Sequence, residues 1–446
     1  MNMINVRRLT VMTFLGAGML SGISAQVSPL QVDTLKETKI PDQWDLQSCI
    51  DYAKEQNITI RKNRITAAST QIDVKTAKAA LFPSLSFSTG HQVVNRPYQE
   101  TSSRVSGSEI ISSNSKTSYN GNYGLNASWT LYNGNKRLKT IQQEKLNNQM
   151  AELDVATSEN NIQESIAQVY IQILYAAESV KVNENTLQVS IAQRDRGQEL
   201  LNAGSIAKSD LAQLEAQVST DRYQLVTAQA TLEDYKLQLK QLLELDGENE
   251  MNIYLPALSD ENVLAPLPTK KDVYISALSL RPEIEASKLN VEASELGINI
   301  AKSSYFPTIS LSAGIGTNHT SGSDFTFGEQ VKNGWNNSIG LSVSVPIFNN
   351  RQTKSAVQKA KLQYETSMLS LLDEQKTLYK TIEGLWLDAN SAQQRYAAAN
   401  EKLKSTQISY ELISEQFNLG MKNTIELLTE KNNLLQAQQE QLQAKY

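Results

Sequence analysis

The chain consists of two copies of one unit, and this duplication limits its possible folds more than any other feature of the sequence. Three segments of the first copy, AKAALFPSLSFSTG, GLNASWTLYNG and LLNAGSIAKSDL, recur in the same order as AKSSYFPTISLSAG, GLSVSVPIFNN and QFNLGMKNTIEL. They lie at 77–90, 124–134 and 200–211 in the first copy, and at 301–314, 340–350 and 416–427 in the second. The offset between the copies falls from 224 to 216 residues after the first pair, so a loop of variable length follows that segment.

Each copy predicts the element order helix, strand, strand, helix, helix. The first helix covers about 45–81 in one copy and about 272–304 in the other, and it ends at a Phe-Pro pair because proline disfavours helix in the residue before it. Apolar residues then alternate with small polar ones, and a period of two indicates a strand. The predicted strands lie at 84–94, 122–132, 307–316 and 337–348.

A long helix follows the second strand of each copy. Between 134 and 201 there is no proline, and Ile166, Ile173 and Leu187 lie on one row of a seven-residue repeat, which is typical of a coiled coil. At about 1.5 Å per residue this helix would be roughly 100 Å long, more than a globular domain can use. The second copy predicts its long helix at 350–417.

The remaining segments complete the predicted domain organisation. The N-terminus is typical of a secretory signal peptide, since Arg7 and Arg8 precede an apolar run and a small-residue cleavage site. Short tips join each long helix to a last helix, and a connector with three prolines separates the copies. The predicted boundaries are a signal peptide at 1–25, a leader at 26–44, repeats at 45–245 and 271–446, a connector at 246–270, and tips at 202–208 and 418–423.

Composition excludes several functions. The formal net charge is -5, and 42 basic and 47 acidic residues are mixed evenly, so there is no extended basic patch for nucleic acid. Two histidines and one cysteine predict no dedicated metal site, and we expect no cofactor. The cysteine, Cys49, lies too far beyond the cleavage point to be a lipidated first residue, and we expect it to be buried. No stretch resembles a membrane-spanning helix, and the mean hydropathy is -0.39.

The predicted strands suit a membrane. Their cores contain no Asp, Glu, Lys or Arg, and each has about the ~10 residues that cross a bilayer at a tilt. Aromatic residues flank both ends: Phe82, Tyr132, Phe306 and Phe348 where strands meet helices, and Tyr98, Tyr119, Tyr123 and Trp335 toward the loops. Two aromatic belts indicate two membrane interfaces, although a soluble sheet would also show the alternation.

Four strands cannot close a barrel, and open strand edges are not tolerated in lipid. The chain must therefore assemble with copies of itself. A dimer would supply eight strands, a trimer twelve and a tetramer sixteen, and the strand pattern itself does not choose among them.

The paired motifs, including the strand exits LYNGNK and VPIFNN, resemble the TolC-like outer-membrane efflux family over nearly all of the mature chain. The resemblance implies a mainly α fold with a transmembrane β-barrel part: a homotrimer whose twelve strands form one barrel, continued by a long α-helical barrel in the periplasm. It implies contact with outer-membrane lipid, and a periplasmic adaptor protein and an inner-membrane transporter as partners. The function would be that of a passive exit duct from the periplasm in a tripartite efflux or export system.

The same resemblance assigns roles at the tips, which form the periplasmic mouth in this family. The adaptor-contacting residues would be Gly204, Ser205, Gly420 and Met421, and the gate residues would be Asp210, Glu426, Phe417 and Lys422. In a trimer the two carboxylates would form negative rings that favour cations. Alternatively, each carboxylate merely stabilises the N-terminus of a helix.

Two other classes of function fit the sequence less well. An enzyme lacks support, because the sequence has no Gly-rich phosphate loop, nucleophile motif or metal-ligand spacing, and His91 and His319 are expected to be solvent-exposed near the loops. A soluble periplasmic coiled-coil interaction protein without pore activity would explain the heptads and the signal peptide. It would not explain uncharged strands bracketed by aromatic residues. The exported substrate, whether drug, metal or protein, is not encoded in any motif of the chain.

Overall fold

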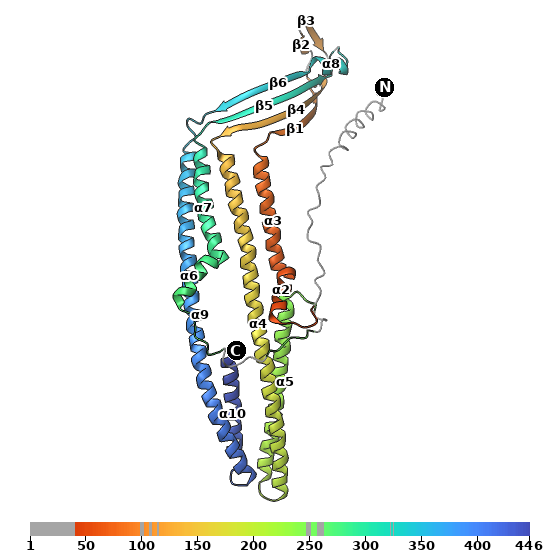
Figure 1. Cartoon of the computed structure of the whole chain (residues 1–446). Coiled ribbons are helices and arrows are strands. Elements are labelled where there is room, and N and C mark those ends of the chain that lie inside the picture. The colour runs from red at the N-terminus through yellow and green to blue at the C-terminus, as the bar shows by residue number, and fades with distance from the viewer. Residues whose placement is uncertain are drawn as a thin grey trace, which may run out of the picture. The chain divides into compact units, whose positions relative to one another are not determined.

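The computed structural model of the chain describes residues 41–98, 102–106, 109–113, 116–246, 251–256, 263–321, 323 and 325–446. The predicted signal peptide and most of the predicted leader lie outside the described residues, as do parts of the connector and of the loop after the first strand. Residues from Gln43 to Tyr446 form one compact unit. This unit consists mainly of long helices, with an antiparallel sheet at their ends (Figure 1).

The helices are α2 Leu46–Gln56, α3 Ile58–Ala79, α4 Lys136–Asn202, α5 Lys208–Leu242, α6 Lys270–Leu280, α7 Pro282–Ser303, α8 Phe327–Asn333, α9 Gln352–Asn418 and α10 Thr424–Lys445. The strands are β1 Ser84–Asn95, β2 Ser102–Ser106, β3 Glu109–Ser113, β4 Thr117–Asn133, β5 Thr308–Thr320 and β6 Asn336–Ser344. The fold is therefore mainly α with a smaller antiparallel sheet, as the sequence predicted. Among the described residues, none of the helices has both the length and the hydrophobicity needed to cross a bilayer.

The prediction of one continuous first helix in each copy is wrong, because this segment forms two helices in both copies. Asn57 has an extended backbone, and its side chain caps α3 by accepting from the N–H groups of Thr59 and Ile60. Arg281, which lies 224 positions later, is extended because Pro282 follows it. The break is thus part of the repeated unit.

The second strands also differ from their predicted bounds. β6 ends at Ser344, short of the predicted 348, because Pro346 has no N–H to donate to a strand ladder. β4 begins at Thr117, five residues before the predicted start, so the strand extends into the region that was predicted as a loop. The variable loop contains the β2–β3 hairpin in the first copy and α8 in the second, which accounts for the change of offset.

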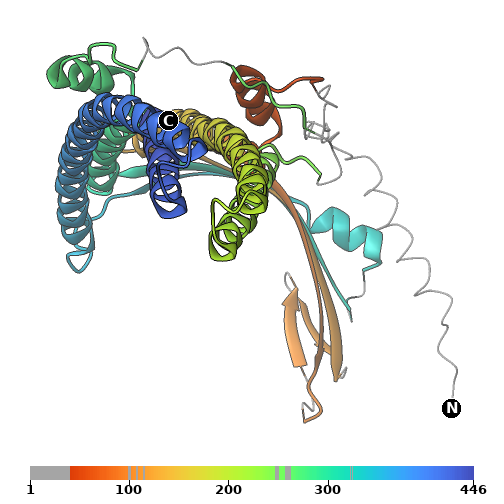
Figure 2. The same ribbon diagram turned by 90° about the horizontal axis from the view of Figure 1, so that it is seen from below.

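The two copies stand side by side. The sheet order is β1-β4-β5-β6, and every neighbouring pair is antiparallel. Beneath the sheet, α3 packs on α4, α4 on α7 and α7 on α9. Farther from the sheet, α5 packs on α4, and α10 packs on both α9 and α4, so that these helices follow an arc in Figure 2. One edge of the unit is therefore formed by β1 and α3, and the other by β6 and α9.

A compact core lies about midway along α4. Trp44 pairs with Ile253 of the connector as in a parallel ladder, through hydrogen bonds from Trp44 N to Asn252 O and from Tyr254 N to Trp44 O, each 2.8 Å long. The buried core residues are Trp44, Cys49, Ile50, Ala53, Ile166, Tyr170, Ile173, Leu174, Leu239 and Leu243. The connector and the segment before α2 thus pack together against the first repeat.

Cys49 is expected to resist alkylation in the folded protein. Its side chain is fully buried, and burial raises the pKa of the thiol to about 12, so very little thiolate forms at pH 8. Iodoacetamide should label the native protein at least about 100-fold more slowly than the denatured protein, as measured by mass spectrometry. Ser279→Cys on the exposed face of α6 provides the control and should react rapidly; equal rates at both cysteines would contradict the buried placement.

Candidate functional site

The sheet has one apolar face and one small polar face. Directly opposed residues on antiparallel strands point to the same side of a sheet, so the register assigns every residue to a face. The apolar face carries Leu85, Phe87, Leu125, Ala127, Trp129, Ile309, Leu311, Ala313, Ile315, Ile339, Leu341 and Val343. The opposite face carries Ser84, Ser86, Ser88, Asn126, Ser128, Ser310, Ser312, Gly314, Gly340 and Ser342.

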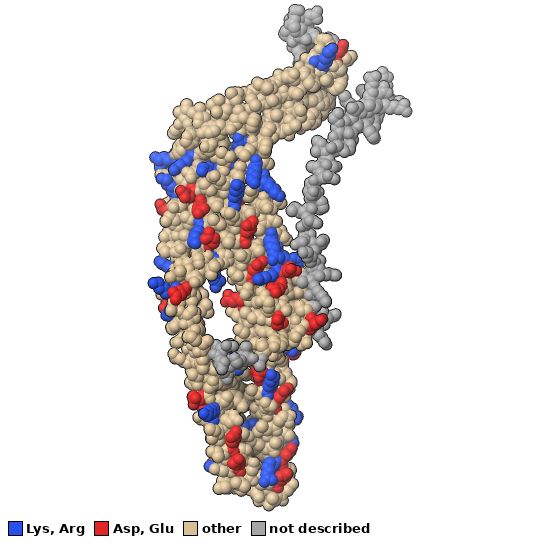
Figure 3. Space-filling view, in the orientation of Figure 1, with Lys and Arg blue, Asp and Glu red and all other residues tan. Residues whose placement is uncertain are grey.

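The apolar face is exposed in the single chain. Ile339 is 82% exposed and Leu341 is 63% exposed. The four strands of this sheet contain no Asp, Glu, Lys or Arg, and Figure 3 shows the sheet as an uncharged zone between charged ends. An apolar surface of this extent marks a region that contacts lipid or another protein chain.

Most of the aromatic residues expected to flank the strands lie at or near strand ends, whereas Tyr119 and Tyr123 lie within β4 and pair with β1. Phe82, Phe306 and Phe348 are exposed at the end of the sheet next to the helices, and Tyr132 is half-buried there. Trp335 is exposed at the opposite end, one residue before β6. The uncharged zone is therefore bracketed by aromatic side chains at both ends.

The two histidines belong to an aromatic cluster at the loop end of the apolar face. The Tyr119 hydroxyl lies 2.6 Å from Nδ1 of His91, and the His319 ring packs edge-on against Tyr119 and Phe327. The expected solvent exposure is correct for His91 but wrong for His319, which is half-buried because these two rings enclose it. No three or more His, Cys, Asp or Glu side chains of the described residues come together as a possible metal site.

Each helical tip turns at a glycine. Gly204 has φ +77° and Gly420 has φ +76°, in the left-handed region that glycine adopts without strain. The next residue in each tip donates its N–H back to the preceding helix, from Ser205 to Leu200 O and from Met421 to Gln416 O, both at 2.8 Å. The two tips therefore have the same hydrogen-bonded turn.

The repeated carboxylates have a local structural role in these turns. Asp210 and Glu426 are each the third residue of their helix, where Asp210 accepts from Ala207 N at 3.0 Å and Glu426 from Asn423 N at 3.2 Å. Each therefore satisfies an N–H group that the helix leaves unpaired. The recurrence of an acid at both positions is explained by helix capping without any further role.

Among the predicted gate residues, Lys422 and Glu426 form an ion pair in the single chain. Lys422 Nζ lies 2.6 Å from Oε1 of Glu426, and this hydrogen bond, together with that from Asn423 N, holds the pKa of the carboxyl below its ordinary value. Phe417 is only 2% exposed, at the end of α9. Asp210 lies on the other tip, where its carboxylate accepts from Ala207 N.

A buried ion pair between the repeats was missed in the sequence. Lys431 on α10 bonds both to the Asp221 carboxylate on α5 and to the Ser190 hydroxyl on α4, and that hydroxyl donates to Asp221. The two charged side chains are only 4% and 1% exposed. Gln217 Nε2 donates to the other carboxylate oxygen at 2.9 Å. Burial lowers the pKa of the Lys431 ammonium, an effect that Asp221 opposes.

The sequence does carry a signal for this pair. Asp221 follows Val218 on the apolar row of α5, and Lys431 lies between Leu427 and Leu435 on the apolar row of α10. A charged residue on an apolar helical row is costly unless it is paired, so each position called for an opposite charge nearby.

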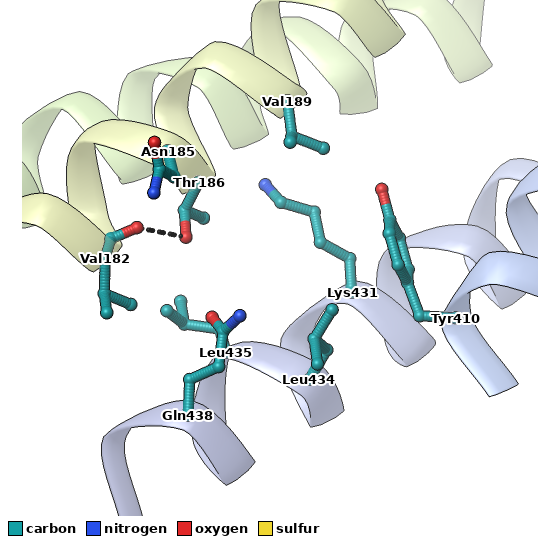
Figure 4. A pocket seen from close by; sticks show the side chains of 9 residues that line it. All are labelled: Val182, Asn185, Thr186, Val189, Tyr410, Lys431, Leu434, Leu435 and Gln438. Atoms are coloured by element: carbon teal, nitrogen blue, oxygen red, sulfur yellow. Dashed lines mark hydrogen bonds between the residues drawn. The ribbon is translucent and has the colours of Figure 1, made fainter. Parts of the chain in front are cut away.

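A second polar contact lies beside the ion pair. A cleft of about 110 Å³ lies between α4, α9 and α10. Figure 4 shows the Lys431 stem and the Tyr410 ring along its walls. The Tyr410 hydroxyl accepts a hydrogen bond of 2.8 Å from Gln193 Nε2 of α4. The helices of the two repeats are thus joined at two neighbouring points.

Comparison with known proteins identifies the family. The sequence pattern described as "Outer membrane efflux protein" matches residues 49–244 and 273–446. The chain belongs to the outer membrane efflux protein family. The match covers both repeats and leaves out the connector, so both copies carry the pattern of this family.

Relatives within the outer membrane efflux protein family are distant. Outer membrane efflux protein BepC of Brucella suis biovar 1 is 24% identical over 65% of this chain and 60% of its own length. Outer membrane protein TolC of Escherichia coli is 24% identical over 63% of this chain and 57% of its own length. The chain thus matches less than two thirds of either relative.

The solved structure of CusC, described in terms of transmembrane channel formation, has a TM-score of 0.75 at 19% identity and covers 90% of this chain and 88% of that one. The fold is therefore of the TolC type. As a member of the outer membrane efflux protein family, the chain resides in the outer membrane, with its helical part in the periplasm. The family is one of efflux ducts, not a class of enzymes.

Proposed function

We propose that this protein is the outer-membrane exit duct of a tripartite efflux or export system, a passive conduit from the periplasm to the exterior. The observation that carries this proposal is the open-edged, uncharged sheet with one apolar and one small polar face. Its partners would be two further copies of itself, a periplasmic adaptor protein and an inner-membrane transporter. The soluble coiled-coil alternative gives the exposed apolar face no role.

The strand directions are compatible with ring closure. Strands alternate in direction across the order β1-β4-β5-β6, so β6 of one copy would meet β1 of the next copy antiparallel. Such a head-to-tail contact generates a closed ring when the rotation permits. The helical layer ends at the same edges, and on α3 the exposed Ile58, Ile65 and Ile72 form a heptad row that a neighbouring α9 would cover.

The proposed trimer places the two sheet faces in different solvents. Twelve strands enclose more space than side chains fill, and a face of Ser, Gly and Asn leaves an aqueous lumen. The apolar face would then contact lipid, and the aromatic residues at both ends of the strands would lie at the two membrane interfaces. The helices continue the lumen into the periplasm.

Electrical recording tests the proposal directly. The purified mature protein should require detergent to leave the membrane and should form conducting pores in a planar bilayer. A water-soluble, non-conducting monomer would favour the coiled-coil alternative. Co-purification of an adaptor and a transporter from intact envelopes would identify the other components.

The tips are the proposed contact and gate regions. Met421 is exposed beside Gly420, and Gly204 and Ser205 form the corresponding turn of the first repeat, so an adaptor could contact all four residues. The gate would combine Asp210, Glu426, Phe417 and Lys422. Because Lys422 already pairs with Glu426, Asp210 would contribute most of the uncompensated negative charge.

Neutralising the tip carboxylates should reduce cation selectivity. In the double variant Asp210→Asn and Glu426→Gln, both new side chains can still accept from the backbone N–H groups that they cap, while the negative rings disappear. The cation-to-anion permeability ratio from reversal potentials should fall severalfold. The control variant Asp234→Asn with Glu365→Gln removes the same charge far from the tips. Unchanged selectivity in the tip variant would exclude a gate role for the two carboxylates.

A further inference from the structure

The helix ends next to the sheet carry charge of one sign. Four ten-residue windows at these ends, 74–83, 134–143, 297–306 and 349–358, contain eight Lys or Arg and no Asp or Glu. This is unlike the rest of the chain, where both signs are mixed and the net charge of the whole is -5. Seven of the eight cations, here named the basic collar, are Lys75, Lys78, Lys136, Lys139, Lys302, Arg351 and Lys354.

The eighth cation, Arg137, is used within the fold. Its guanidinium donates to Ala80 O at 2.7 Å and to Thr130 O, so it ties the end of α3 and strand β4 to the start of α4. The seven collar residues differ from Arg137 in their contacts. Among the described residues none of the seven forms an ion pair, six are exposed, and Lys139 is half-exposed. Their charges are therefore not compensated within the chain.

The collar lies directly beside the uncharged sheet. Figure 3 shows Lys and Arg side chains gathered beneath the sheet, where the helices begin. Between collar and sheet lie the exposed rings of Phe82, Phe306 and Phe348. A ten-residue helical window rises about 15 Å, whereas a headgroup layer is roughly 5–7 Å thick and charge acts over a Debye length of about 8 Å. The whole collar would thus lie within reach of lipid phosphates.

We propose that the basic collar binds the headgroup phosphates of anionic phospholipids in the leaflet from which the helices emerge. This inference rests on the proposed function, because the collar meets headgroups only if the sheet lies in lipid. The cations come from four separate helix ends along the width of the sheet, an arrangement that suits a layer of phosphates better than one bound ion. Aromatic rings at the interface followed by cations are typical of membrane boundaries.

The test uses the full mature protein reconstituted in vesicles of phosphatidylcholine alone or mixed equally with phosphatidylglycerol. After mild extraction in a nonionic detergent, mass spectrometry gives the ratio of the two lipids retained by the protein. The collar variant carries Lys75→Gln, Lys78→Gln, Lys136→Gln and Lys354→Gln. The matched control carries Lys271→Gln, Lys376→Gln, Lys380→Gln and Lys404→Gln, which are exposed lysines of α6 and α9 distant from the sheet.

Each cation close to an anionic surface strengthens binding roughly fivefold. The wild type and the control variant should therefore retain more phosphatidylglycerol than phosphatidylcholine at low salt. The ratio of the two lipids should be at least about fivefold lower for the collar variant, and high salt should lower the ratio for the wild type. If all three proteins insert into phosphatidylcholine vesicles and retain equal amounts of phosphatidylglycerol from the mixed vesicles, that result would overturn the proposed lipid binding by the collar and leave the proposed function standing. Failure of the wild type to enter any vesicle would overturn both. Displacement of phosphatidylglycerol by inorganic phosphate would assign the collar to a free anion instead.

Discussion

Asp221→Ala is expected to lower the free energy of unfolding by roughly 3–5 kcal/mol, because it leaves the Lys431 ammonium buried without its counter-charge. Ser190 would remain as a hydrogen-bond partner, but a hydroxyl does not replace the charge of a carboxylate. The loss acts where α4 and α5 of the first repeat meet α10 of the second. Thermal unfolding in detergent, followed by circular dichroism, should show a clear decrease in Tm.

Two further variants separate the burial of charge from the loss of a contact. Asp221→Leu combined with Lys431→Met replaces the ion pair by apolar side chains and should recover most of the stability, since well-packed apolar residues commonly substitute for buried pairs. Lys402→Ala breaks the pair between Lys402 and Glu440, whose side chains are 43% and 40% exposed, and should cost only about 0–1 kcal/mol. If Asp221→Ala costs no more than Lys402→Ala, the buried pair contributes little to holding the repeats together.

The features that could be predicted from the sequence are those set by short-range periodicity. The alternation of Leu85 and Phe87 with serines fixes a strand and its two faces, and the heptads of α4 fix a long helix. The repeat then links strands that are far apart in the chain. The mainly α fold and the family follow from these local patterns taken in order.

The features that were missed depend on contacts between distant segments. The break after α2 is supported by the Asn57 amide, which donates to Leu242 O at 3.1 Å, and no local pattern reports that contact. The corresponding break at Arg281 did have a local signal in Pro282. Asp221 and Lys431 each interrupt an apolar row, but only the fold shows that they interrupt it opposite each other.

At the tips, a local structural cause and a functional role predict the same residues. An acid three residues after a cap is a common start of a helix, and Asn423 followed by Glu426 has this pattern in the sequence. Asp210 has no capping side chain at Ala207, yet its carboxylate still accepts from that N–H. A gate role for these acids therefore has to be established by permeation, not by their recurrence.

Leu341→Arg is expected to prevent stable assembly in the membrane, whereas Ser342→Arg should not. The two positions are neighbours in the middle of β6, but Leu341 is on the apolar face opposite Leu311 and Ser342 is on the polar face opposite Ser310. An arginine facing lipid near the bilayer midplane costs roughly 2–4 kcal/mol, and in the proposed trimer that cost is incurred three times. An arginine facing an aqueous lumen remains hydrated.

The two variants should therefore diverge in two measurements. Detergent extracts of the membranes should contain the oligomer of the Ser342→Arg variant at near wild-type levels. They should contain little oligomer of the Leu341→Arg variant. Single-channel recording of the Ser342→Arg variant should show lower cation selectivity, because its positive charges line the lumen. Since the substitutions are identical and adjacent, strand propensity cannot account for a difference, and the orientation of the sheet is what is tested. A reversed outcome would mean that the serine face meets lipid, and equal outcomes would mean that neither face does.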